Sequence, residues 1–193
     1  MTLQTNFEIW AQIILCDRDK ERIRKFFVDE IGINQKTVIR RMHLSIYYAR
    51  RPMLGVIPLV RKIHIVLPTA ETRFMVMAPG GENPSPDIDP KNHKVGIRIQ
   101  RKSTVMSTII ELRNGLLKYE TESVLGGRSP SNLKRNAFGS RYYQPHIAIL
   151  RTGSEIDTDL TIIGNLFRYR IEDLTFDKFI IDVVPAKKVA KTK

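Results

Sequence analysis

Apolar and polar residues alternate along residues 40–48, and this period of two predicts a β-strand. Successive side chains of a strand point to opposite faces, so His43, Ser45 and Tyr47 are expected on one face. The opposite face would carry the residues Leu44, Ile46 and Tyr48. A histidine and a hydroxyl two residues apart on a strand are directed at the same point, which makes this segment a candidate functional site.

A second segment, residues 142–150, repeats the arrangement about a hundred residues later. His146 is expected on one face of this predicted strand, with Ile147 and Ile149 on the other. The position two residues after His146 is occupied by Ala148, so the second segment lacks the hydroxyl of the first. The function of the protein is expected to depend on these two histidine strands together.

In the predicted secondary structure, strands and helices alternate at both ends of the chain, and several strands follow one another in the middle. The other predicted strands are residues 7–15, 60–67, 73–78, 95–101 and 177–184. The predicted helices are residues 20–31, residues 103–121 and a segment from Asp157 or Asp159 to about residue 170. Asp17 or Asp19 is expected to cap the first helix, and Gly32 to end it. Residues 79–90 and 126–140 are expected to be loops.

Each end of the chain therefore has the order strand, helix, strand. We predict an α+β fold of two lobes related by an approximate two-fold axis, with antiparallel-rich sheets around a central cleft and helices outside. This arrangement would bring the two histidine strands side by side. The length of 193 residues suits one such domain, residues 1–185, followed by a disordered basic tail, residues 186–193.

Positive charge is concentrated around both histidine strands. The chain has 32 Lys and Arg against 20 Asp and Glu, a formal net charge of +12. Residues 31–70 and 123–154 contain no acid, and these two windows include both histidine segments. The excess suggests a polyanionic partner such as nucleic acid, the alternative being a solvated basic surface. The basic residues that we select as candidate substrate contacts are Arg41, Arg128 and Arg151.

Two imidazoles can perform acid-base chemistry on a phosphodiester without a metal. A neutral histidine takes a proton from the attacking oxygen, and a protonated histidine gives one to the leaving oxygen. Ser45 could donate a hydrogen bond to a phosphate oxygen. Tyr47 and Tyr143 could stack on a base, although tyrosines on strands are more often packed. We expect no metal and no cofactor, because the aspartate pairs fit turns and helix caps better than metal ligation.

The compartment is predicted from what the sequence lacks. Cys16 is the single cysteine, so an intrachain disulfide is impossible and a reducing compartment is the simple expectation. The sequence has no signal-peptide pattern and no apolar run of roughly 20 residues. We expect a cytoplasmic protein that does not bind membranes; its oligomeric state is open.

The segments His43-Leu44-Ser45-Ile46 and His146-Ile147-Ala148-Ile149 resemble the paired motifs of the two-histidine phosphoesterase superfamily. In that superfamily a histidine is followed by an apolar residue, a serine or threonine, and another apolar residue. The resemblance spans nearly the whole chain, from residue 7 to residue 184, through the order of its elements. The second motif departs at Ala148, where Thr152, Tyr143 or an arginine could take over the role of the hydroxyl.

The resemblance implies a metal-independent phosphodiesterase in which His43 and His146 are the acid-base pair and Ser45 contacts the phosphate. The superfamily includes RNA 2′,3′-cyclic phosphodiesterases with 2′,5′-RNA ligase activity, which implies substrates with RNA 2′,3′-cyclic phosphate ends or related linkages. It also includes enzymes that degrade 2′,5′-oligoadenylate or cyclic oligonucleotide signals, and this alternative stays open. A third possibility is an RNA-binding module on a catalytically weakened scaffold.

Overall fold

The computed structural model describes residues 7–50, 57–77, 94–124, 145–151 and 172–185. Its strands are β1 (Phe7–Leu15), β2 (His43–Arg50), β3 (Leu59–Leu67), β4 (Thr72–Met77), β5 (Lys94–Ile99), β6 (His146–Arg151) and β7 (Leu174–Pro185). Its helices are α1 (Asp17–Lys25), the π-turn η1 (Phe26–Glu30), the 3₁₀ turns η2 (Gln35–Thr37) and η3 (Thr69–Glu71), and α2 (Met106–Val124). The mixture of helices and antiparallel strands confirms the predicted α+β class.

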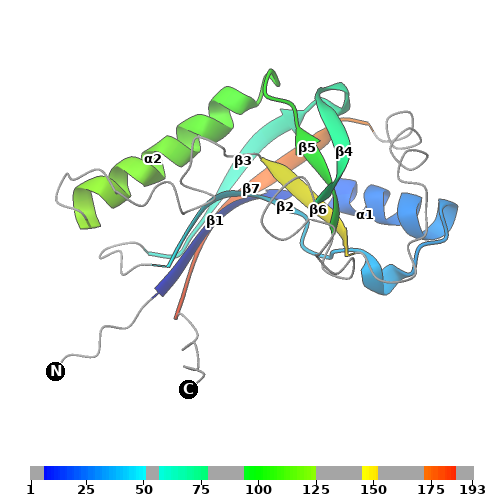
Figure 1. Ribbon diagram of the computed structural model, residues 1–193, viewed down its shortest axis with the longest axis horizontal. Coiled ribbons are helices and arrows are strands. Elements are labelled where there is room, and N and C mark those ends of the chain that lie inside the picture. The colour runs from blue at the N-terminus through cyan, green and yellow to red at the C-terminus, as the bar shows by residue number, and fades with distance from the viewer. Residues whose placement is uncertain (1–6, 51–56, 78–93, 125–144, 152–171, 186–193) are drawn as a thin grey trace, which may run out of the picture.

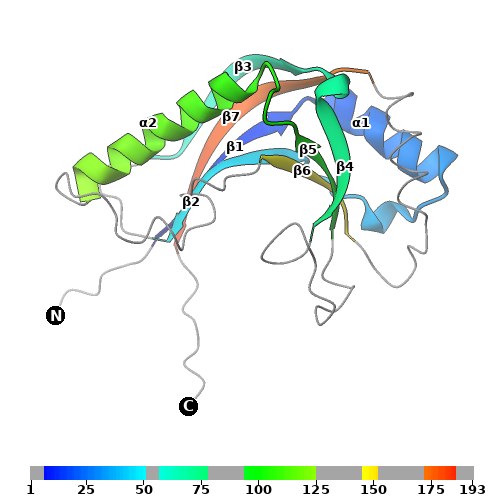
Figure 2. The same ribbon diagram turned by 45° about the horizontal axis from the view of Figure 1, so that its top comes forward.

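The seven strands form one sheet in the order β3-β7-β1-β2-β6-β5-β4, and every neighbouring pair is antiparallel. Figure 1 shows α1 and α2 at opposite ends of the molecule with the sheet between them. Figure 2 shows how strongly the sheet curves. The two histidine strands, β2 and β6, are neighbours within the sheet, as the sequence predicts. The arrangement into two symmetric lobes around a cleft stays a prediction.

One face of the sheet, which we call the core face, is packed. It carries Ile13, Leu44 and Ile147, none of which has any exposed surface. Side chains of the helical segments, including Ile23 and Ile109, join the same hydrophobic cluster. Burial of an isoleucine or leucine side chain contributes about 1.5–3 kcal/mol, so this face is the main source of stability. The opposite face, which carries His43, Ser45 and His146, is called the histidine face.

A β-bulge in β2 changes which side chains share the histidine face. Gln12 of β1 pairs with Ser45, but the preceding residue Ala11 pairs with Tyr47, so Ile46 is an extra residue in β2. Tyr47 therefore turns to the core face, where it is fully buried. The prediction that Tyr47 lies beside His43 and could stack on a base is wrong, because it assumed uninterrupted alternation. Tyr48 takes the histidine face instead.

A second bulge lies at the corresponding place in β6. Gly96 of β5 pairs with Ala148, whereas Val95 pairs with Leu150, so Ile149 is the extra residue. Leu150 turns to the core face and has no exposed surface. The next residue, Arg151, consequently lies on the histidine face, although it is an odd number of positions from His146.

The helix ends differ in detail from those predicted. Helix α1 begins at Asp17 after the N-cap residue Cys16, which makes no side-chain capping bond, so the predicted cap at Asp17 or Asp19 is wrong. Both aspartates lie in the first turn, where negative charge is favourable. The helical segment ends as predicted at Gly32, whose φ is +82°.

The second helix begins at Met106 rather than at residue 103. A carboxylate oxygen of Glu71 accepts hydrogen bonds from the Thr104 backbone N–H (2.7 Å) and hydroxyl (3.1 Å), which holds the chain in a turn ahead of α2. The predicted helix at residues 157–170, the two predicted loops and the basic tail lie outside the described residues. No helix in the described ranges is long and apolar enough to cross a membrane.

Candidate functional site

The register of β2 and β6 brings the two candidate histidines onto one face. Leu44 pairs with Ile147 in antiparallel orientation. One step away on either side of this pair, Ser45 therefore lies opposite His146, and His43 lies opposite Ala148. His43 and His146 are thus diagonal neighbours, an arrangement in which side chains originate about 7–8 Å apart. Both histidines are half-buried. This separation leaves room for a phosphate between two imidazole rings.

The ring of His43 is held in a defined tautomer. Its Nδ1 lies 2.9 Å from the carbonyl oxygen of Arg41. A carbonyl oxygen only accepts hydrogen bonds, so Nδ1 carries the proton in the neutral ring. The ring also contacts the edge of Trp10, with the ring centroids 6.0 Å apart at an interplanar angle of 89°. These contacts fix the orientation of the imidazole on the histidine face.

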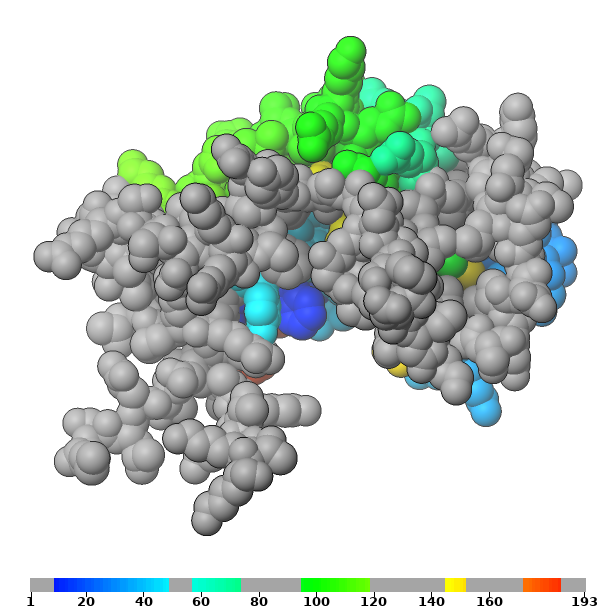
Figure 3. Space-filling view, in the orientation of Figure 1, coloured from blue at the N-terminus to red at the C-terminus, as the bar shows by residue number. Residues whose placement is uncertain are grey.

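Trp10 of β1 connects the two polar residues of the first motif. Its indole Nε1–H donates a hydrogen bond to Ser45 Oγ at 3.1 Å. In this bond the hydroxyl oxygen of Ser45 is the acceptor. Trp10 is 38% exposed and makes an edge contact with Tyr48, at 5.4 Å between ring centroids. In the space-filling view, atoms of β1 and β2 reach the surface near the centre (Figure 3).

A polar cluster lies beside this aromatic group. The Arg41 guanidinium donates to Asp182 Oδ2 at 2.8 Å, and Gln12 Nε2 donates to the same oxygen at 3.4 Å. Arg41, predicted to bind substrate, is therefore part of an ion pair with a residue of β7. The side-chain oxygen of Gln12 is buried and has no hydrogen-bond partner in the described part of the chain.

The other predicted contacts divide into two groups. Arg151 is exposed on the histidine face, as the bulge in β6 requires. Tyr143 and Arg128 lie outside the described residues, as does Thr152. His64, which we did not include in the site, lies exposed on β3 at one edge of the sheet.

Sequence reasoning missed two residues of the histidine face. Trp10 lies in a mostly apolar run that indicated only a buried strand, and nothing in the sequence pairs β1 with β2 in this register. Arg98 of β5 lies directly opposite His146 and is only 8% exposed. The one signal for Arg98 was a basic residue at an alternating position inside an otherwise apolar strand.

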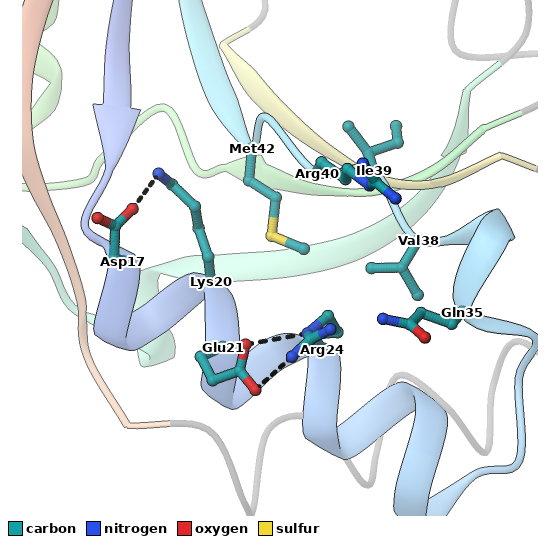
Figure 4. Close-up of a pocket in the computed structure, with 9 residues that line it drawn as sticks. All are labelled: Asp17, Lys20, Glu21, Arg24, Gln35, Val38, Ile39, Arg40 and Met42. Atoms are coloured by element: carbon teal, nitrogen blue, oxygen red, sulfur yellow. Dashed lines mark hydrogen bonds and ion pairs between the residues drawn. The ribbon is translucent and has the colours of Figure 1, made fainter.

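A cavity of about 330 Å³ lies between α1 and the segment that leads into β2 (Figure 4). Two of its basic residues are neutralised within it, because Lys20 pairs with Asp17 at 2.7 Å and Arg24 pairs with Glu21 at 2.6 Å. The hydrogen bond from Lys20 lowers the pKa of Asp17, and that from Arg24 lowers the pKa of Glu21. No histidine is among the residues that line this cavity, so the two candidate histidines lie outside it.

No group of three His, Cys, Asp or Glu side chains within the described ranges is placed to hold a metal ion. No protein-family model matches the sequence, and no curated protein matches it significantly.

Proposed function

We propose that the chain is a metal-independent phosphodiesterase that acts on ribose-linked phosphodiesters by acid-base catalysis. The observation that supports this most directly is the register of β2 and β6, which places His43 and His146 on one face as diagonal neighbours. Two imidazoles at this separation can act on opposite sides of one phosphorus atom. The resemblance of the two motifs to the two-histidine phosphoesterases points to the same chemistry.

The proposed reaction with a 2′,3′-cyclic phosphate needs two proton transfers. A water molecule attacks the phosphorus while a neutral histidine accepts a proton from it, and the bond from phosphorus to one ribose oxygen breaks. The other histidine, which is protonated at the start, gives its proton to that leaving oxygen. The residue that acts as base is not assigned; His43 would act through Nε2, since Nδ1 is bound to a carbonyl. Ser45 would donate its hydroxyl proton to a non-bridging oxygen as negative charge develops there.

The linkage cleaved could be an RNA 2′,3′-cyclic end, a 2′,5′ bond or a cyclic oligonucleotide, and parallel assays with these substrates separate the three. A second candidate function is RNA binding without turnover. It is favoured by Ala148, which leaves the second motif without a hydroxyl, together with the net charge of +12. That function predicts salt-sensitive RNA binding and no product with any of the three substrates.

The test of the proposed function is turnover of adenosine 2′,3′-cyclic phosphate and of short RNAs in the presence of a chelator. His43→Ala and His146→Ala should each reduce turnover by about 10²–10⁴-fold, the usual contribution of a general acid or base. His64→Ala is the matched control, because this exposed histidine lies on the edge strand β3 and should leave the rate unchanged. A wild-type rate in either of the first two variants would refute the proposal.

A further inference from the structure

Arginines continue across the sheet from His146. Arg98 of β5 lies opposite His146, and Arg73 of β4 lies opposite Arg98, so the three side chains form a row on the histidine face. Arg151 is on the same face but outside this row, because it pairs with Lys94, four pairing positions along the strands from Arg98 and His146. Strands β4, β5 and β6 contain no acidic residue. These three strands therefore contribute arginines and no carboxylate to this half of the histidine face.

The other half of the histidine face has a different character. On β1, Ile14 pairs with His43 and Gln12 pairs with Ser45, and the Trp10 ring contacts both His43 and Ser45. The guanidinium of Arg41 is paired with Asp182 of β7. An aromatic platform thus lies on one side of the histidine pair and an arginine group on the other. A ligand that uses both sides must carry a base toward β1 and negative charge toward β4.

The spacing of the strands separates the arginines from the scissile phosphate. Neighbouring strands lie about 4.8 Å apart, so Arg98 starts one spacing beyond His146 and Arg73 starts two, roughly 10 Å away. A single phosphate held between His43 and His146 would not occupy the whole row. Arg98 is only 8% exposed, and such burial is unusual for an arginine. Burial restricts the positions that its planar guanidinium group can take.

We propose that Arg73 and Arg98 form a second phosphate-binding subsite, which takes the phosphate next to the scissile one. This inference rests on the proposed function and narrows it: the substrate is an oligonucleotide with at least two phosphates, rather than a mononucleotide. The chain of the substrate extends from the histidine pair toward β4, and guanidinium groups bind the oxygens of its next phosphate through paired hydrogen bonds.

The experiment compares two substrates in wild type and variants. Adenosine 2′,3′-cyclic phosphate carries only the scissile phosphate, and a dinucleotide that ends in the same cyclic phosphate carries one more. We expect wild-type kcat/KM to be about tenfold or more higher for the dinucleotide, the value of one charge-assisted hydrogen bond. Arg73→Gln, a change at an exposed position, should remove most of this preference and leave the mononucleotide rate within about twofold of wild type.

Lys62→Gln is the matched control, because Lys62 is an exposed cation of β3, at the opposite edge of the sheet. It should leave both rates unchanged. Because Arg98 is buried, its test variant is Arg98→Lys, which keeps the charge but removes the planar fork, and it should lower the dinucleotide rate selectively. Equal losses for both substrates would place these arginines at the scissile phosphate and overturn the inference, as would a wild-type enzyme without preference for the dinucleotide.

Binding separates a failure of this inference from a failure of the proposed function. The fluorescence of the single tryptophan, Trp10, reports binding of adenosine 3′-phosphate and of a dinucleotide that ends in a 3′-phosphate. If no substrate is turned over but Arg73→Gln still weakens only dinucleotide binding, the subsite stands and the catalytic proposal fails. If Arg73→Gln affects neither ligand, or both equally, the subsite is wrong whether or not the protein is an enzyme.

Discussion

The hydrogen bond from Trp10 to Ser45 can be tested by replacing each partner. Trp10→Phe removes the indole N–H, which lies 3.1 Å from Ser45 Oγ, and keeps an aromatic ring against His43 and Tyr48. A hydrogen bond of this kind contributes about 0.5–1.5 kcal/mol. Since about 1.4 kcal/mol corresponds to tenfold, we expect kcat to fall roughly two- to tenfold in Trp10→Phe.

Ser45→Ala should have the larger effect. If its hydroxyl donates to the phosphate as charge develops, its loss should reduce kcat by about 10²–10³-fold, as for the removal of other oxyanion donors. Once the hydroxyl is absent, the indole N–H of Trp10 has no Ser45 oxygen to orient, and the phenyl ring of Trp10→Phe still contacts His43. The double variant should therefore be no slower than Ser45→Ala alone.

The assay is single-turnover cleavage of a 2′,3′-cyclic phosphate substrate by the four proteins of this double-mutant cycle. A single-turnover rate at saturating enzyme excludes changes in substrate affinity caused by the altered ring. Near-ultraviolet circular dichroism checks that the variants retain their tertiary packing. Additive effects would show that Trp10 acts on the substrate directly, through its exposed ring, and would refute the reasoning from the hydrogen bond.

Three further predictions concern stability and pH. Asp19 is fully buried and accepts hydrogen bonds from the Thr175 backbone N–H (2.6 Å) and from Arg18. Asp19→Ala should therefore lower the free energy of unfolding, measured by urea titration, by about 3 kcal/mol. The control Asp17→Ala, at an exposed site, should lower it by less than about 0.5 kcal/mol. Hydrogen bonds from Ser103 and the Thr104 backbone lower the pKa of Glu71 in the folded protein. The ionised carboxylate therefore stabilises the fold fully above the unfolded pKa of 4.5, and this stabilisation is lost as pH falls through the lower folded pKa. The stability difference between wild type and Glu71→Gln in thermal melts should shrink over that acidic window, and a constant difference would contradict this. The proposed acid-base pair predicts a bell-shaped dependence of kcat/KM on pH, and a flat profile between pH 5 and 8 would argue against it.

The sequence is sufficient to predict most of the strands and the pairing of β2 with β6. Alternating patterns, and for β1 a mostly apolar run, predict the strands to within a few residues, because the core face of the sheet is buried throughout. His43 and Ser45 share a face as predicted, since no bulge falls between them. The pairing of β2 with β6 followed from the similarity of the two ends of the chain, and it is the feature on which the site depends.

The errors have one main physical cause. In each histidine strand two consecutive apolar residues, Ile46 and Tyr47 in β2 and Ile149 and Leu150 in β6, are both buried. Strict alternation places consecutive residues on opposite faces, so it cannot predict two consecutive buried residues unless a bulge is assumed. For this reason alternation alone assigns Tyr47 to the wrong face. Adjacent apolar residues within an otherwise alternating strand are the signal that was available. The contacts of Trp10 and Arg98 were out of reach, because they depend on the register between strands distant in the sequence.

The two bulges lie at equivalent positions, three residues after each histidine, and this has a consequence for protein engineering. Each bulge divides its strand into an inner half, whose pairing orients the imidazole, and an outer half that is out of step by one residue. Deleting Ile46 or Ile149 would restore regular pairing without exchanging the two faces, because Tyr47 could still pair with Ala11 and Leu150 with Val95. Tyr48 and Arg151 would then stay on the histidine face, so a single-residue deletion at either place should be better tolerated than one at a regularly paired position of β2 or β6.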